Sequence, residues 1–192
     1  MEYRIKSEDL FGVLSAWDEV MAGRTKVHLI ACGGTALTLL GFKESTKDVD
    51  LLVPNLNEYK RLVTFLKQAG YQQSTSYGWR RPEETVIYDL YAGNRVYQTE
   101  LPDSPLKRGG NQKIREWKKI YLGVLNPIDL IITKMFRGTP VDLEDCLALL
   151  RKEKVSLKTL KQRYEETAKY DVSETRALKN LGLLLKRYHE EK

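Results

Sequence analysis

At 192 residues the chain is long enough to bury one hydrophobic core with an appended subdomain, and it needs no disulfides to do so. Its two cysteines, Cys32 and Cys146, lie far apart without CxxC or Cys/His spacing, which argues against a structural zinc site and is typical of a reducing cytoplasm. No apolar run approaches the roughly 20 residues of a membrane helix, and the N-terminus lacks the apolar segment of a signal peptide. We therefore expect a soluble, cytoplasmic protein.

The net charge of +6 is unevenly distributed along the chain. Residues 107–119 hold six Lys or Arg against one acid, and residues 151–192 hold twelve against seven, so each stretch carries +5 and the rest of the chain carries −4. Basic side chains that bind phosphates release counterions, so this distribution indicates a polyanionic partner such as RNA. A charge excess that only maintains solubility explains it equally well.

The N-terminal half alternates helices and strands. A capped amphipathic helix begins at Ser7 and ends near Gly23. Short apolar runs bounded by glycine or proline predict strands, and apolar residues at helical spacing predict helices. The further elements expected here are a strand at 26–32, a short helix at 35–42, a strand at 48–53 and a helix at 55–69.

The remainder changes from strands to helices. We expect a pair of strands at 71–80 and 84–92 and one or two strands within 112–124. Asn126–Pro127 then opens a helical region, because proline is favoured in the first turn of a helix. Four helices are predicted, at 127–137, 141–152, 156–169 and 173–190. Since helices need a partner surface, these should pack as a bundle against the sheet or against each other.

Asp48 and Asp50 open the predicted strand DVDLLV. Because side chains alternate along a strand, both carboxylates project from one face while Val49 and Leu51 point to the core. Carboxylates this close repel each other unless a cation lies between them, and hard oxygen ligands select Mg²⁺ or Mn²⁺. Two solvated acids at a strand end are the simpler interpretation, which the DxD motif alone does not exclude.

Gly33–Gly34 stands between the predicted strand at 26–32 and a helix. Such glycines let the backbone approach a ligand closely beside the unpaired amides of the helix start, which suits a triphosphate, although a tight turn needs them too. Thirteen residues separate Gly34 from Asp48, and this connection carries Lys43 and Lys47. The order strand, glycine pair, helix, basic loop and acidic strand favours a nucleotide site.

The segment GGTALTLLGFKESTKDVDLLV resembles the signature of polymerase-beta-type nucleotidyltransferases, in which two small residues and a spacer precede Asp-hydrophobic-Asp-hydrophobic. Within that superfamily it is similar to minimal AbiEii-type proteins, several of which are toxins of toxin–antitoxin pairs. The stretch NPIDLIITKMFRGTPVDLEDCLALL resembles their second block, in which a helix with a lysine precedes a helix that begins with acids, here Lys134, Asp142 and Asp145.

This resemblance implies a fold of the α+β class (α/β mixed). The expected architecture is a nucleotidyltransferase-type mixed sheet flanked by helices, with a C-terminal helical subdomain. Residues 1–125 would form the catalytic domain and residues 126–192 the helical subdomain.

The resemblance also implies a third carboxylate on a neighbouring strand. In ETVIYDLYAG the acid within the apolar part of the strand is Asp89, which we therefore nominate, with Glu83, Glu84 and Glu100 as alternatives. Asp48, Asp50 and Asp89 would then be the catalytic and metal-binding residues, with Mg²⁺ or Mn²⁺ activating an acceptor hydroxyl and neutralising the triphosphate.

The nucleotide itself is expected to contact the glycine turn and nearby polar residues. The predicted contacts are Gly33, Gly34, Thr35, Lys47, Lys134 and Asp145. Lys134 lies in an apolar helix, so snorkelling to solvent is the alternative to a phosphate contact. Asp145 is expected to face Lys134 rather than a metal ion.

The function implied is transfer of a nucleoside monophosphate from an NTP to a hydroxyl of RNA, with the tRNA 3′ end as one candidate acceptor. The protein would be a toxin with an antitoxin partner. Two alternatives remain open at this point. An antibiotic nucleotidyltransferase would need an acidic pocket for a cationic substrate, and a non-catalytic nucleotide- or partner-binding protein would keep the fold without the activity.

Overall fold

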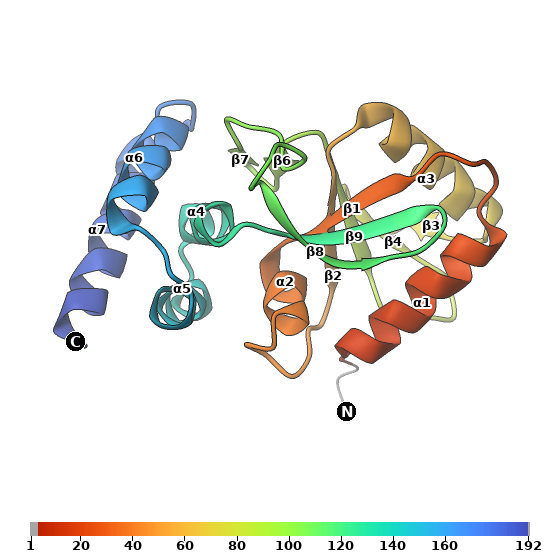
Figure 1. The fold of residues 1–192 in the computed structure, drawn as a ribbon, viewed down its shortest axis with the longest axis horizontal. Helices are drawn as coiled ribbons and strands as arrows, with labels where there is room; N and C mark the ends of the chain where they lie inside the picture. Colours follow the sequence, from red (N-terminus) through yellow and green to blue (C-terminus); the bar gives the residue numbers. More distant parts are fainter. Residues whose placement is uncertain (1–3, 192) are drawn as a thin grey trace.

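The computed structural model describes residues 4–191, which form a mixed sheet with helices on both sides (Figure 1). The helices are α1 (Ser7–Val20), α2 (Gly33–Leu39), α3 (Leu56–Gln68), α4 (Pro127–Arg137), α5 (Pro140–Lys152), α6 (Leu157–Ala168) and α7 (Glu174–Glu190). The strands are β1 (Val27–Ala31), β2 (Val49–Val53), β3 (Gln72–Gln73), β4 (Gly78–Arg80), β5 (Tyr88–Ala92), β6 (Arg95–Val96), β7 (Thr99–Glu100), β8 (Asn111–Glu116) and β9 (Ile120–Leu125). This architecture confirms the expected fold class.

The central sheet has seven strands in the order β3-β4-β5-β2-β1-β9-β8, and β6 pairs with β7 in a separate hairpin. Strand β2 runs parallel to β5 and antiparallel to β1. Because Ala31 pairs with Leu51, the end of β1 lies beside the beginning of β2. The glycine turn that follows β1 therefore reaches the acids at the start of β2 directly.

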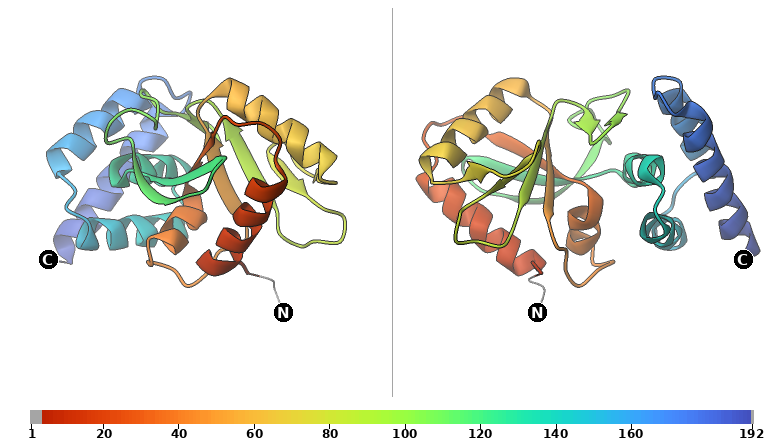
Figure 2. Two further views of the ribbon diagram at one scale, coloured as in Figure 1. Left: turned by 45° about the vertical axis from the view of Figure 1, so that its right-hand side comes forward. Right: turned by 180° about the vertical axis from the view of Figure 1, so that it is seen from behind.

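One face of the sheet is covered by α1 and α3, which lie together over it in Figures 1 and 2. The Trp17 side chain connects α1 to α3 and to the sheet. The centre of its ring lies 6.1 Å from the centre of the Phe65 ring on α3 and 5.1 Å from that of the Tyr88 ring on β5. Asp89 follows Tyr88 along β5, and Asp50 follows Val49, the register partner of Tyr88, along β2. Neighbouring side chains of a strand point to opposite faces. The two acids therefore project from the opposite face of the sheet.

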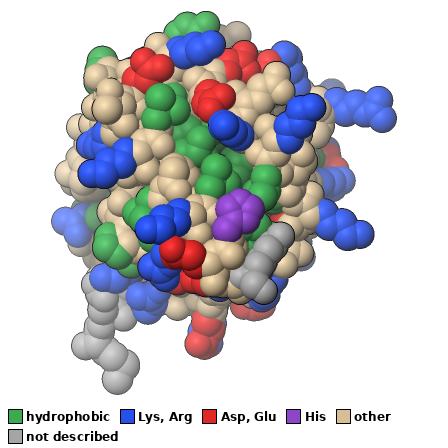
Figure 3. All heavy atoms as spheres, turned by 90° about the vertical axis from the view of Figure 1, so that its left-hand side faces the viewer, with side chains coloured by type: hydrophobic (Ala, Val, Ile, Leu, Met, Phe, Trp, Pro, Cys, Tyr) green, Lys and Arg blue, Asp and Glu red, His purple; other side chains and the backbone are tan. Residues whose placement is uncertain are grey.

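The four C-terminal helices lie together at one end of the molecule, beyond α2 and the edge of the sheet (Figures 1 and 2). On the outer face of this helical region, Lys and Arg side chains are interspersed with acidic and hydrophobic ones (Figure 3). Nowhere in residues 4–191 is a helix both long and apolar enough to cross a membrane.

The predicted elements are recovered with local differences. Asn55, Asn126 and Thr139 cap α3, α4 and α5 with their side chains. The cap expected from Ser7 is wrong: Ser7 Oγ donates to the Thr38 carbonyl, and the Lys6 N–H at the start of α1 donates to the Asp9 carboxylate at 3.0 Å.

Two regions of short strands differ from the expected elements. The strand expected at 71–80 is divided into β3 and β4 by a turn, and the β6–β7 hairpin was not predicted. Two-residue strands are too short to show an alternating pattern. Cys32 and Cys146 are free and lie fully buried in the core.

Candidate functional site

The turn at Gly33–Gly34 packs directly against the acidic segment at the start of β2. Gly33 has a φ of +56°, and a Cβ placed on it would overlap the Asp50 carboxylate and lie 2.9 Å from its Cγ. A Cβ on Gly34 would lie 2.7 Å from Oγ1 of Thr46. The two glycines are therefore required for this close approach, and the turn and the acids form one site, as the sequence predicts.

Threonine hydroxyls fix the backbone that carries the two acids. Thr35 Oγ1 accepts the N–H of Asp50 at 2.8 Å and donates to the carbonyl of Asp48 at 3.2 Å. Thr46 Oγ1 donates to the same carbonyl at 3.0 Å. Because the Thr35 side chain is buried and occupied by these bonds, it positions Asp48 and Asp50 rather than lining the cavity beside them.

The three predicted acids differ in their surroundings. Asp48 is exposed, Asp50 is only 7% exposed, and Asp89 is half-buried. Asp50 and Asp89 are register partners on parallel strands, so their side chains lie side by side on one face. Burial raises the pKa of Asp50. Burial, followed by the charges of Asp50 and Asp48, raises the pKa of Asp89 to about 6.

The geometry favours Asp89 over the other candidates for the third acid. Glu83 and Glu84 line a different hollow beside α1, where Glu84 pairs with Arg81, and Glu100 is an exposed residue of β7. A divalent cation beside these carboxylates would relieve the repulsion that contributes to the raised pKa of Asp89, and carboxylate oxygens are the ligands that Mg²⁺ prefers. Within residues 4–191, however, no three His, Cys, Asp or Glu side chains converge closely enough to hold an ion by themselves.

Two tyrosines that the sequence did not single out contact Asp50. The hydroxyls of Tyr97 and Tyr91 donate to Asp50 Oδ1 at 2.9 and 3.3 Å. Tyr97 lies in the β6–β7 hairpin and has a φ of +52°, a conformation that non-glycine residues adopt only when their surroundings enforce it. Burial and the Asp50 charge raise the pKa of both hydroxyls, so they remain hydrogen-bond donors to the carboxylate.

A basic cavity of about 370 Å³ lies beside Gly34 and the acids. Its lining comprises Arg4, Gly34, Lys43, Ser45, Thr46, Lys47, Asp48, Asp50, Tyr97, Lys134, Arg137, Val141 and Asp145. Five of these side chains are basic and three are acidic, so the cavity has the charge balance that suits the phosphates of a nucleotide.

A buried ionic network connects α4, α5 and the loop before β2. Asp145 Oδ2 accepts from Lys134 Nζ at 2.8 Å and from Lys43 Nζ at 2.7 Å, so Asp145 faces Lys134 as expected. Lys134 is only 3% exposed and also lies 3.4 Å from Asp142. Arg137 makes two hydrogen bonds to Asp142, which raise the pKa of the guanidinium. In this structure Lys134 is therefore paired with acids.

The basic stretch 107–119 is largely engaged in local contacts. Lys107 pairs with Asp103, and Lys113 pairs with Glu116. Lys119 donates to main-chain carbonyls, and the Arg115 guanidinium lies 5.2 Å from the ring of Trp117. Trp79 is buried in the core.

We expect Gly33→Ala to destabilise the protein much more than Gly41→Ala. Both glycines have positive φ, so each alanine incurs about 1 kcal/mol of backbone strain, but nothing lies within 4 Å of a Cβ on Gly41. The overlap with Asp50 should bring the loss for Gly33→Ala to about 3 kcal/mol. Urea denaturation of both variants measures the difference. Equal losses would mean that Gly33 is needed only for its backbone conformation.

Asp89→Asn should stabilise the protein at pH 7. The pKa of Asp89 is raised from 3.8 to about 6, so the folded state disfavours the ionised carboxylate, and this cost appears as the pH rises from about 4 to about 6. Removing the charge should add about 1–2 kcal/mol at pH 7, allowing for the solvent that reaches this half-buried group, and nothing at pH 3.5. Urea denaturation at the two pH values tests this. If Asp89→Asn were only as stable as the wild type at pH 7, the raised pKa of Asp89 would be contradicted.

A glycine turn beside two acids at the start of one strand, with a third acid in register on the next strand, is the arrangement that the resemblance in the sequence implies for a nucleotidyltransferase. Residues 8–192 match the family described as "Nucleotidyltransferase of unknown function (DUF6036)". The protein belongs to this nucleotidyltransferase family. The resemblance seen in the sequence is thus confirmed at the level of nucleotidyltransferases, and the AbiEii-type assignment stays a prediction.

Among solved structures, the chain is similar to that of a candidate nucleotidyltransferase from H. pylori. The sequence identity is 15%, the TM-score is 0.45, and the match covers 97% of each chain. No curated protein matches the chain.

Proposed function

We propose that the protein transfers a nucleoside monophosphate from an NTP to a hydroxyl group of RNA, with Asp48, Asp50 and Asp89 at the centre of the reaction. The observation that carries this proposal is the juxtaposition of these acids with the Gly33–Gly34 turn and the adjoining basic cavity. Membership of a nucleotidyltransferase family supports the reaction type.

Different residues would bind the triphosphate and activate the acceptor hydroxyl. The triphosphate would occupy the basic cavity, against Gly34 and within reach of Lys43 and Lys47. Mg²⁺ or Mn²⁺ held by Asp48 and Asp50, with Asp89 completing the set, would supply charge neutralisation and lower the pKa of the acceptor hydroxyl. The remaining contribution of the protein is positioning and electrostatic stabilisation, which phosphoryl transfer chiefly requires.

Asp89 is suited to accept the proton of the acceptor hydroxyl. It lies beside Asp50 on the same face of the sheet and is mainly ionised at neutral pH, so it can take up a proton. In the reaction, the acceptor oxygen forms a bond to the α-phosphorus, the bond from that phosphorus to the bridging oxygen breaks, pyrophosphate leaves, and the proton passes to Asp89.

RNA is the acceptor that the charges favour. The chain carries a net charge of +6, and the lining of the candidate nucleotide cavity has more basic than acidic side chains. A cationic antibiotic would need the opposite balance. Since several cations of 107–119 have local partners, the preference for RNA depends on the whole surface rather than on that stretch alone.

Incubation of the protein with each labelled NTP, Mg²⁺ and total RNA tests the proposal. We expect label to enter RNA from at least one NTP, and chelation of Mg²⁺ to prevent this. Calorimetry provides the binding measurement: Mg²⁺-dependent NTP binding should be lost when Asp48→Asn and Asp50→Asn are combined. Mg²⁺-dependent NTP binding without incorporation into any acceptor would favour the non-catalytic alternative.

The AbiEii-type resemblance adds the proposal that this activity is toxic and is restrained by an antitoxin protein. Induced expression of the wild type should then arrest growth, and expression of Asp50→Asn should not. Normal growth during expression of a protein that is active in vitro would reject the toxin role and leave the enzymatic proposal intact.

A further inference from the structure

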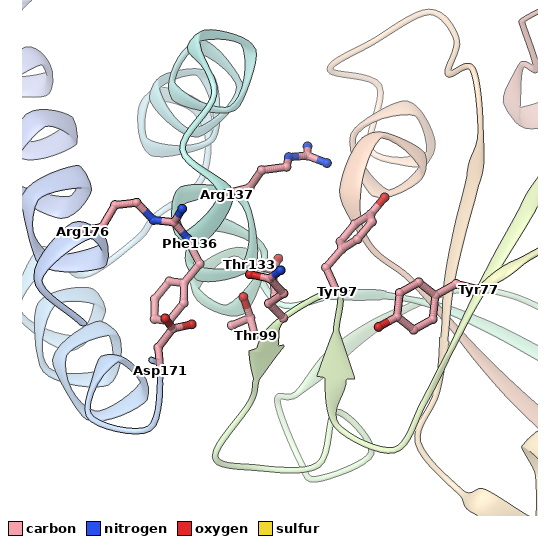
Figure 4. A pocket seen from close by; sticks show the side chains of 9 residues that line it. Tyr77, Tyr97, Thr99, Thr133, Phe136, Arg137, Asp171 and Arg176 are labelled. Atoms are coloured by element: carbon pink, nitrogen blue, oxygen red, sulfur yellow. The ribbon is translucent and has the colours of Figure 1, made fainter. Parts of the chain in front are cut away.

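A second cavity of about 320 Å³ adjoins the candidate nucleotide cavity (Figure 4). It lies between the β6–β7 hairpin, α4 and the turn that joins α6 to α7. Tyr97 and Arg137 line both cavities, and the Arg137 guanidinium lies 5.5 Å from the centre of the Tyr97 ring. The two cavities therefore meet at this pair of side chains.

The second cavity lies towards Asp89. Tyr77, part of its lining, accepts the N–H of Leu90 through its carbonyl at 2.9 Å, and the next residue, Gly78, is the register partner of Asp89. A Cβ on Gly78 would lie 3.0 Å from Asp89 Oδ1. The nucleotide cavity, in contrast, is lined by Asp48 and Asp50. Asp89 itself is in the lining of neither of these two cavities, but the backbone that follows it is bonded to Tyr77 at the wall of the second one.

The lining combines aromatic rings with two guanidinium groups and with the Asp171 carboxylate, which accepts the N–H of Ser173 at 2.6 Å. In Figure 4, Tyr77 and Tyr97 stand on one side of the cavity, and Phe136 and Arg176 on the other. Arg176 is exposed and, among the described residues, has no acidic partner, whereas Arg137 is bonded to Asp142. Rings stack on nucleobases and guanidinium groups bind phosphates, so this combination recognises a nucleotide unit of a single strand. Its volume is at the lower end of small-ligand pockets, enough for one such unit.

We propose that the second cavity binds the 3′-terminal nucleoside of the RNA acceptor, with its base against Tyr77 and its neighbouring phosphate at Arg176. The terminal hydroxyl then lies beside Asp89 and faces the α-phosphate of the NTP in the first cavity. This assignment rests on the proposed function, for which it identifies the acceptor site.

Binding of a short fluorescent single-stranded RNA with a free 3′-hydroxyl, followed by anisotropy, tests the assignment. Tyr77→Ala should weaken RNA binding about 10- to 100-fold, because loss of base stacking has effects of this size. Arg176→Ala should weaken it about 5- to 10-fold through the lost phosphate contact. Tyr77 is 38% exposed, so its truncation should leave the fold intact. Calorimetry should give the same NTP affinity for both variants and the wild type.

The controls are Tyr170→Ala and Arg24→Ala, which remove exposed side chains of the same kinds outside the cavity. Neither should change RNA binding. A 3′-phosphorylated RNA should bind the wild type more weakly than the free 3′-hydroxyl RNA, because its terminal phosphate would lie against Asp89. Equal binding of RNA by the wild type and both cavity variants, or equal binding of the two RNAs, would overturn the assignment.

The outcomes separate this assignment from the proposed function. Transfer to RNA by variants that bind RNA normally would refute the acceptor cavity and retain the enzymatic function. Selective loss of RNA binding in the variants, with no transfer by the wild type, would retain the cavity as an RNA site and refute the enzymatic function.

Discussion

Asp50→Asn is expected to reduce nucleotide transfer about 1,000-fold or more while leaving the protein at least as stable as the wild type. The carboxylate is the buried member of the acidic group, and its loss removes a ligand for the divalent ion. Metal stabilisation of the transition state amounts to several kcal/mol, and each 1.36 kcal/mol corresponds to a factor of ten in rate.

The stability of this variant follows from the local hydrogen bonds. Asparagine has the shape of aspartate and retains an oxygen that can accept from Tyr97 and Tyr91. Burial raises the pKa of Asp50 in the folded state, so the ionised side chain lowers stability at neutral pH and its neutral replacement does not. Thermal melting and incorporation of labelled NTP into RNA, measured on the same preparation, give both quantities.

Tyr97→Phe is the matched control for the Asp50 variant. It removes one hydrogen bond to Asp50 but retains the carboxylate, so transfer should fall by no more than about tenfold. If Tyr97→Phe reduced nucleotide transfer as much as Asp50→Asn does, the tyrosine hydroxyl itself would be essential for the reaction. Wild-type transfer by Asp50→Asn would show that the reaction centre lies elsewhere.

The sequence predicts the part of the site that depends on local pattern. The spacing of Gly33–Gly34 and the alternation in DVDLLV place the turn and the acids together, because β1 and β2 are short apolar runs with clear boundaries, which are typical of buried strands. Asp89 follows from the same alternation in β5, and its pairing with Asp50 depends only on the parallel register.

The unpredicted part depends on contacts between distant segments. Tyr97 reaches Asp50 from a hairpin of two-residue strands, which leaves no periodic signal in the sequence. The sequence also gives no sign that the Thr35 hydroxyl bonds the backbone at Asp48 and Asp50, and its predicted contact with nucleotide stays a prediction. The charge of 107–119 suggested a binding surface, yet Glu116 pairs with Lys113 and with Lys26 from the segment before β1, a pairing that only the fold creates.

Asp145→Ala should lower the free energy of unfolding by about 3 kcal/mol, because it leaves the buried Lys134 ammonium without its nearer partner. Asp142 remains 3.4 Å from Lys134 but already accepts hydrogen bonds from Arg137 and Thr139. The same substitution also removes the ion pair between Asp145 and Lys43, which anchors the loop that leads to Asp48. Urea denaturation measures the loss.

A double variant separates the structural role of this network from a role in nucleotide binding. Replacing both partners with apolar residues, as Lys134→Met with Asp145→Leu, should recover most of the stability, since a buried ion pair contributes little beyond a well-packed apolar pair. If Lys134 or Asp145 also serves the triphosphate, this stable double variant should bind NTP with Mg²⁺ at least about tenfold more weakly than the wild type, a difference of about 1.4 kcal/mol. Calorimetry decides the question: wild-type affinity in the double variant would show that the network only holds α4, α5 and the loop before β2 together, and would leave the phosphates to Gly34, Lys43 and Lys47.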